Sequence, residues 1–173
     1  METPLISLVC IAILVVGTVT MAVSSFQAAS TVTEALKEME NQAADIRLTE
    51  IDAVDNMDVG DADILLTVEN DGQTNLAQFP KWDVIAYYDN GGADYLTYLE
   101  YTASSSPGSN QWTVQGIYLP NDNPEAWDPD ILNPGEKMVL LIGLDPQLSS
   151  ESSGRITVST PNGVTSQSII TRQ

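Results

Sequence analysis

The chain has 173 residues, and its 24 acidic and six basic residues give it a formal charge of −18 at neutral pH. This excess of negative charge would repel nucleic acid and anionic lipid headgroups, so nucleic acid is excluded as a partner. The length allows one compact domain of about 125 residues after an N-terminal helix, but not two such domains.

The N-terminal segment is the most apolar part of the chain. Residues 3–33 contain no charged residue, and residues 4–26 are long enough to cross the hydrocarbon core of a bilayer as a helix. No basic residue precedes Lys37, so the basic beginning of a secretory signal peptide is missing, and we expect the mature protein to retain this helix. Small residues four positions apart, such as Thr18 and Ala22, allow helices to approach closely. The segment must therefore lie in lipid or against copies of itself.

The helical pattern continues beyond one membrane span. Apolar residues recur at spacings of three and four between positions 32 and 46, while charged residues such as Glu34 and Glu38 point away from them. No Gly or Pro lies between Gly17 and Gly60, so one helix of about 40 residues and about 60 Å is predicted. We expect the helix to occupy residues 1–45 and a separate domain to occupy residues 46–173.

The rest of the chain is patterned as short strands separated by turns. An extended stretch is predicted to begin with Ile46, Leu48 and Ile51, and residues 89–92 are predicted to turn the chain into a hairpin. Further strands are predicted over residues 62–69, 82–88, 95–101, 111–119, 137–144, 154–159 and 164–171. Strands at this spacing, without helices between them, favour a sandwich over a parallel sheet. The predicted fold class is therefore α+β: a long N-terminal hydrophobic α-helix followed by an Ig-like antiparallel β-sandwich.

The residues needed for catalysis are almost absent. The chain has no histidine, which excludes a Ser-His-Asp triad and imidazole metal ligands. Its one cysteine, Cys10, lies in the apolar segment, and no glycine-rich phosphate-binding motif is present. We therefore expect no enzymatic activity, no catalytic residues and no cofactor.

Two acidic clusters in predicted loops are candidate calcium sites, because hard cations bind several oxygen ligands from a turning loop. The first cluster precedes the second strand and contains Asp52, Asp55, Asp58, Asp61 and Asp63. The second surrounds Trp127, and its candidate ligands are Asp122, Asp128 and Asp130. Neither has the EF-hand spacing, and solvated loops are the simpler interpretation in so acidic a chain. No metal site is predicted.

The order of elements and two C-terminal motifs resemble a known family. A retained apolar helix that runs into an amphipathic half and then a β-sandwich is similar to the archaeal flagellins, or archaellins, in the type IV pilin superfamily. Residues 132–143 (LNPGEKMVLLIG) resemble the "PGE" strand of archaellins, and residues 154–166 (GRITVSTPNGVTS) resemble their closing segment. Leu5 stands where ordinary type IV pilins have glutamate, which favours the archaellin branch.

The resemblance implies a structural role as the repeating subunit of a swimming filament. In that family a membrane-bound precursor is trimmed by a prepilin-type peptidase, and an ATPase-driven platform moves the helix from lipid into the filament core, with the sandwiches outside. This chain would thus be a homopolymer at the cell exterior, formed through its N-terminal helices. The residues expected to pack in the filament core are Ile6, Val9, Ile13, Val16, Val19, Val23, Phe26, Val32, Leu36 and Met39.

Two alternatives stay open within the superfamily, and one outside it. The chain could be the subunit of an adhesive type IV pilus, or a minor archaellum component that binds the cell envelope. It could also be a surface protein anchored by one helix, whose sandwich binds a partner. A simple anchor, however, has no need of the apolar stripe between residues 32 and 46.

Overall fold

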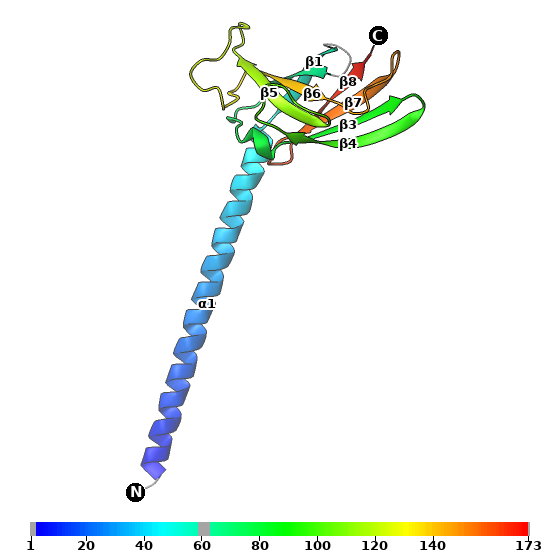
Figure 1. The fold of residues 1–173 in the computed structure, drawn as a ribbon. Coiled ribbons are helices and arrows are strands. Elements are labelled where there is room, and N and C mark those ends of the chain that lie inside the picture. Colours follow the sequence, from blue (N-terminus) through cyan, green and yellow to red (C-terminus); the bar gives the residue numbers. More distant parts are fainter. Residues whose placement is uncertain (1–2, 59–62, 173) are drawn as a thin grey trace. The chain divides into compact units, whose positions relative to one another are not determined.

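The structure of the chain is a computed structural model that describes residues 3–58 and 63–172 (Figure 1). The chain divides into two compact units, Met1–Ala44 and Asp45–Gln173. The first unit contains most of helix α1 (Thr3–Leu48), and the second contains the last turn of that helix and all the described strands.

Helix α1 has 46 residues and is therefore about 69 Å long at 1.5 Å per residue. It ends at Leu48, and the backbone N–H and hydroxyl of the next residue, Thr49, both donate to the carbonyl of Asp45, at 3.0 and 2.8 Å. The prediction that Ile46 and Leu48 begin an extended stretch was wrong, since both belong to the last helical turn. Thr49 is almost completely buried, and the Asn162 side-chain amide donates to its hydroxyl at 2.8 Å. These tertiary bonds place the helix end after Leu48.

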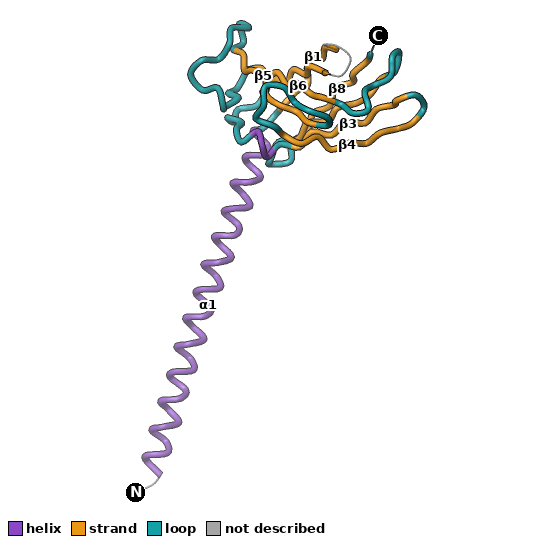
Figure 2. The backbone as a smooth tube through the Cα atoms, viewed as in Figure 1, coloured by secondary structure: helices purple, strands orange, loops and turns teal. Residues whose placement is uncertain are grey.

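The described residues of the second unit form eight strands and one short helix. The strands are β1 (Ile51–Asp58), β2 (Asp63–Asn70), β3 (Asp83–Asn90), β4 (Ala93–Tyr101), β5 (Gln111–Tyr118), β6 (Lys137–Gly143), β7 (Ser153–Ser159) and β8 (Thr165–Thr171), and the 3-10 helix η1 is Phe79–Lys81. Figure 2 shows the strands and the loops that join them.

The strands follow the order β1-β2-β6-β5-β4-β3-β7-β8, and all pairs but one are antiparallel. The exception is a short parallel contact in which Glu100 and Tyr101 of β4 pair with Gln111 and Trp112 of β5. This contact joins two layers, β1-β2-β6-β5 and β4-β3-β7-β8. The outer strands also approach each other, since the Ala53 N–H of β1 donates to the Ser166 hydroxyl of β8 at 3.0 Å. The predicted α+β class is confirmed, with the sandwich almost closed into a barrel.

Alternate side chains of the strands fill the space between the layers. Outward and inward residues alternate strictly along β2 and along most of β3, so Leu66 and Val84 are completely buried. Two tryptophans anchor this core: the Trp82 indole N–H donates to the carbonyl of Ala77 at 3.1 Å, and Trp112 packs edge-on against the Tyr101 ring. The core lies entirely within the second unit.

The loop predicted before the second strand is instead strand β1. Asp52 and Asp55 pair with Glu69 and Thr67 of β2, and Asp63 begins β2; Asp61 lies outside the described residues. Asp is disfavoured in strands, but strand preference depends strongly on context. Here Ile51 is buried in the core, and the backbone of β1 pairs with β2 along its length. These interactions override the local preference.

The hairpin predicted around residues 89–92 is confirmed. Strands β3 and β4 pair from Val84 opposite Leu99 to Asn90 opposite Ala93. Gly91 and Gly92 both have positive φ values, of 64° and 90°, which two-residue turns between right-twisted strands require. The sequence signal worked because glycine adopts this conformation without steric cost.

We predict that a fragment of residues 46–173 folds alone. Because the buried core lies within these residues, the fragment should be soluble, monomeric and rich in β-structure, as measured by circular dichroism and analytical ultracentrifugation. A disordered fragment would show that the sandwich depends on the rest of helix α1.

Candidate functional site

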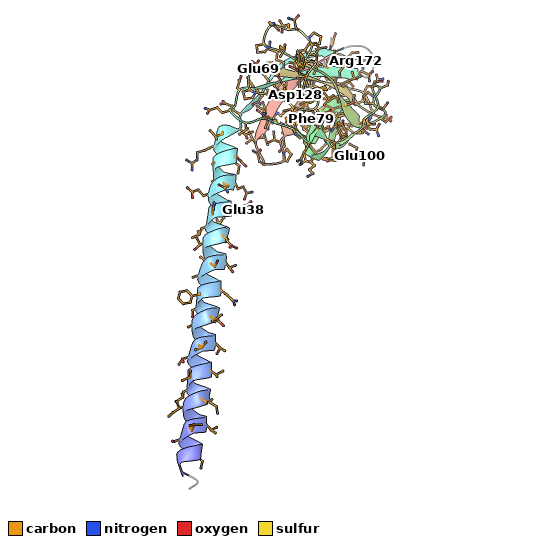
Figure 3. All side chains as sticks on the ribbon, turned by 90° about the vertical axis from the view of Figure 1, so that its left-hand side faces the viewer. Glu38, Glu69, Phe79, Glu100, Asp128 and Arg172 are labelled. Atoms are coloured by element: carbon orange, nitrogen blue, oxygen red, sulfur yellow. The ribbon has the colours of Figure 1, made fainter. Side chains whose placement is uncertain are left out.

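The ten residues predicted to pack in a filament core all lie on α1 with exposed side chains. The exposed fraction ranges from 46% for Val9 to 78% for Phe26. Other large apolar residues on the helix, including Leu8 and Met21, are exposed as well. Figure 3 shows side chains projecting from the helix on different sides along its length. Fully burying one such side chain contributes about 1.5–3 kcal/mol relative to water, so this surface has a strong tendency to leave water.

The ten residues do not form one straight face. At about 100° per residue, the seven residues from Ile6 to Phe26 lie within an arc of about 160°. Val32, Leu36 and Met39 lie on the opposite side of the helix, together with the rest of the stripe between residues 32 and 46. A helix that is apolar in two directions suits a position between several neighbours more than one partner on one side.

Five hydroxyl groups of the apolar segment are satisfied within the helix. The hydroxyls of Thr18, Thr20, Ser25, Thr31 and Thr33 each donate to a backbone carbonyl three or four residues earlier, at 2.8 to 3.0 Å. A hydroxyl bonded in this way does not need water. The segment can therefore lie in lipid or against other helices without leaving these polar groups unpaired.

Among the described residues, one helix is long and apolar enough to cross a membrane, and it covers Ile6–Leu48. A bilayer core is about 30 Å thick, so a span uses about 20 residues and leaves the second half of α1 outside the hydrocarbon. This second half carries the charged residues Glu34, Lys37, Glu38 and Glu40. The sequence thus separates a lipid-compatible half from a water-compatible half on the same helix.

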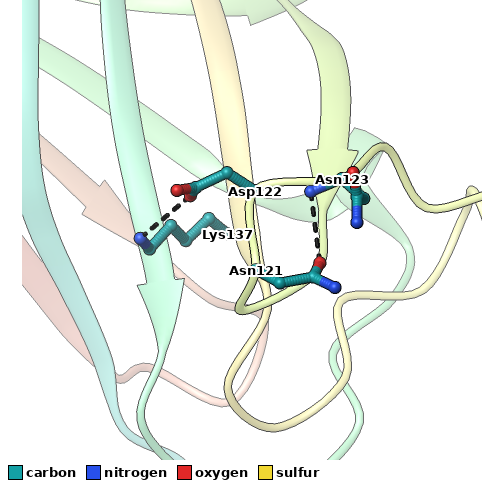
Figure 4. A network of polar contacts seen from close by, with 4 residues as sticks. All are labelled: Asn121, Asp122, Asn123 and Lys137. Carbon is teal, nitrogen blue, oxygen red and sulfur yellow. Dashed lines mark hydrogen bonds and ion pairs between the residues drawn. The ribbon is translucent and has the colours of Figure 1, made fainter.

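The acidic loop between β5 and β6 contains the calcium candidates Asp122, Asp128 and Asp130. The carboxylate of Asp122 forms an ion pair with Lys137 Nζ at 3.4 Å (Figure 4). The loop is also held by its own bonds, since the Asn123 N–H donates to the Asn121 side chain at 3.2 Å. The structure brings no three acidic or thiol side chains together in a way that could hold a metal ion anywhere in residues 3–58 and 63–172.

The motif at residues 133–136 has a structural role in the described sandwich. Glu136 is almost completely buried, and its carboxylate accepts bonds from the Asn133 backbone and side-chain N–H groups at 2.8 and 3.3 Å. Gly135 has a φ of 81°, and its N–H donates to the carbonyl of Asn70 at 2.7 Å. The motif therefore shapes the turn that starts β6.

The sequence analysis missed a group of exposed apolar residues on the outer face of β3 and β4. Ile85, Tyr87, Leu96 and Tyr98 all point away from the core. The signal was present in the alternation of β3: its outward positions include Ile85 and Tyr87, where a solvated sheet face normally carries polar residues.

Comparison with known proteins places these features beside structures of the archaellum. No protein-family model matches the chain, and no curated protein matches its sequence. A structure of the archaellum periplasmic stator complex FlaF and FlaG from Sulfolobus acidocaldarius is 25% identical, with a TM-score of 0.53 over 71% of this chain and 90% of that chain. The archaeal flagellin FlaB1 from Methanocaldococcus jannaschii is 13% identical, with a TM-score of 0.55 over 72% of this chain and 90% of that chain.

The structure of the archaeal flagellum of Methanospirillum hungatei is 13% identical, with a TM-score of 0.57 over 96% of this chain and 91% of that chain. A match over 96% of the chain must include both the helix and the sandwich. The chain therefore has an archaellin-like fold. The similar structures named here are those of archaellum proteins, and none is named as an enzyme.

A substitution on the helix tests whether its apolar surface carries assembly. Val19→Gly removes a side chain that would be buried in a helical bundle, at a cost of about 1.5–3 kcal/mol per copy, whereas in a membrane lipid chains fill the space. We expect a normal amount of membrane-bound protein but short, fragile or missing filaments, measured by membrane immunoblot and electron microscopy.

The control is Ala22→Gly, which weakens the helix at least as much, by about 1 kcal/mol, but removes only a methyl group. Normal filaments with Val19→Gly would contradict a packing role for this position. Equal loss with both variants would mean that helix strength, and not side-chain packing, is responsible.

Proposed function

We propose that this protein is the structural subunit of an archaellum-type surface filament, which polymerises through helix α1 and serves swimming motility. The observation that carries this proposal is the match to an archaeal flagellum over almost the entire chain, helix included. The role is structural, and the site is the apolar surface of the helix.

The chemistry of α1 supports transfer between two apolar surroundings. The segment without charges and with internally bonded hydroxyls suits lipid and a helical bundle equally. Moving such a helix from one to the other exchanges apolar contacts for apolar contacts, so the free-energy change is small. We infer a precursor in the cytoplasmic membrane, and partners in assembly that include a prepilin-type peptidase and an ATPase platform.

A component of the archaellum stator is the second candidate. The observation that favours it is the 25% identity with the FlaF and FlaG complex, higher than the identity with either flagellin structure. A stator component remains at the cell envelope, whereas a filament subunit leaves it. The location of the protein therefore separates the two functions.

The proposal is tested by shearing cells and sedimenting the released material without detergent. We expect most of the protein in the sheared fraction, as filaments that antibodies against residues 46–173 label along their entire length. Deletion of the gene should remove both the filaments and swimming. These results follow because the apolar surface of α1 can be withdrawn from water outside the cell only in a polymer.

Other outcomes identify the alternatives. Protein that stays with the envelope while unlabelled filaments are released would contradict the filament role and favour the stator role. Labelled filaments in cells whose swimming survives the deletion would indicate an adhesive pilus. Detergent-free monomers with an intact helix would contradict any filament role.

A further inference from the structure

The outer face of the layer β4-β3-β7-β8 carries an exposed patch that crosses all four strands. Leu96 pairs with Tyr87, Tyr87 with Arg155, and Arg155 with Ile169, so these residues form one row across the sheet. Strands lie about 4.8 Å apart, and the row is therefore about 14 Å long. Ile85 and Tyr98 lie beside it. The six residues Ile85, Tyr87, Leu96, Tyr98, Arg155 and Ile169 are called the outer patch below.

The outer patch has the character of a contact surface. Leu96 is 75% exposed and Tyr98 56% exposed, although the outward face of such a layer is normally polar. Arg155 lies within the patch, also exposed, and among the described residues its guanidinium has no carboxylate within ion-pair distance. Apolar patches of this kind commonly mark sites of protein interaction.

A second surface lies where the β5–β6 loop folds over β5. A cavity of about 340 Å³ lies there, and its lining residues include Tyr101, Tyr118, Pro124, Pro129, Glu125 and Asp130. The Glu125 carboxylate accepts bonds from the Trp127 and Asp128 N–H groups at 2.6 and 3.3 Å, and the Trp127 bond lowers the pKa of Glu125. The lining of the cavity thus combines the aromatic residues Tyr101 and Tyr118 with the acidic residues Glu125 and Asp130.

Beside this cavity the Trp127 side chain is 90% exposed. Tryptophan is one of the residues that most often dominate the binding energy of an interface. An ionised carboxylate next to aromatic rings is the environment that a guanidinium group prefers, since it offers an ion pair and a cation–π contact together. Arg155 in the outer patch is such a guanidinium, and it forms no ion pair with any described residue.

We propose that the cavity and Trp127 of one copy bind Arg155 and the outer patch of the next copy. The two surfaces are complementary in polarity and charge. The apolar outer patch of one copy accepts the indole of Trp127, and the acidic cavity of the other accepts the guanidinium of Arg155. They are two different surfaces of the sandwich: the cavity lies where the β5–β6 loop folds over β5, and the outer patch lies on the outward face of the layer β4-β3-β7-β8 (Figure 1). A contact between two different surfaces repeats without closing into a dimer, as a helical filament requires. The inference rests on the proposed function, because the contact forms only where copies of the chain lie side by side.

Carboxylates at the edge of the outer patch determine how the contact responds to salt. Asp83, Asp94 and Glu100 lie on the same outer face, and the Tyr98 hydroxyl donates to Asp83 at 3.1 Å. They repel the acidic loop of the next copy, and being exposed they are screened by salt. The Arg155 contact is enclosed and is screened less. We therefore expect the contact to strengthen as ionic strength rises.

The test uses thiol cross-linking of the full-length chain in a Cys10→Ser background, which leaves no native thiol. Ala126→Cys places a thiol beside Trp127, and Gln167→Cys places one beside the outer patch on β8, without altering either anchor. With a short reagent that joins two thiols, we expect a ladder of multimers from the double variant and none from either single variant. Ser105→Cys, exposed in another loop, replaces Gln167→Cys as the matched control and should give no ladder.

A charge exchange identifies the residues responsible. Arg155→Asp or Asp130→Arg alone should lower the ladder yield about tenfold, the effect expected of a close charge pair at an interface. The two changes together should restore it, whereas Asp71→Arg in the turn after β2 should have no effect.

Electron microscopy of the same cells separates this inference from the proposed function. Filaments without a ladder from the double variant would overturn the contact and leave the filament role intact. Equal cross-linking of a single variant with itself would overturn it in favour of a symmetric contact. Absence of filaments would contradict the proposed function, and the ladder, read on the membrane-bound chain, would still decide the contact.

Discussion

An apolar helical surface that must leave water is the constraint on which the rest of this structure depends. Residues 3–33 carry no charge, and the large apolar side chains described on this part of α1 are exposed. Within the described residues 3–44 of its unit, the helix has no second element against which to bury them. Lipid covers such a surface in a membrane, and in the proposed filament other copies of the helix cover it on several sides. The same apolar surface of α1 therefore accounts both for residence in a membrane and for the proposed polymerisation.

In the proposed filament the second unit meets the opposite requirement, because it would remain in water beside many identical copies. Its acidic surface keeps it soluble, but the same charge opposes close packing of neighbours. The few basic residues therefore matter individually. Lys137 is paired with Asp122 within the chain, whereas Arg155 lies exposed in an apolar patch. A cation that forms no ion pair with the described residues of an acidic protein is well placed to select one particular contact between the copies of the proposed filament.

The elements that depend on local sequence patterns could be predicted from the sequence. The features that depend on contacts between distant residues could not. The helix, the strand runs and the turn at Gly91 and Gly92 follow from apolar spacing and glycine geometry. The start of β1 was missed because bonds to Thr49 from residues far along the chain hold the last helical turn. The cavity beside Trp127 was not predictable either, since it joins residues of four separate segments: Phe79, Tyr101, residues 114–118 and the loop of residues 124–130. The outer patch was readable in the alternation of β3, where Ile85 and Tyr87 occupy outward positions.

The most direct test of polymerisation through α1 is a helical reconstruction of the surface filaments by electron cryo-microscopy, at a resolution that shows side chains. We predict that α1 forms the filament axis, with Ile6, Val16 and Phe26 in van der Waals contact with helices of other copies. Val32 and Leu36 should contact neighbours on the opposite side of the same helix. Two results would contradict polymerisation through α1. One is a filament whose axis is formed by another protein, and the other is α1 retained in the membrane of cells that carry complete filaments.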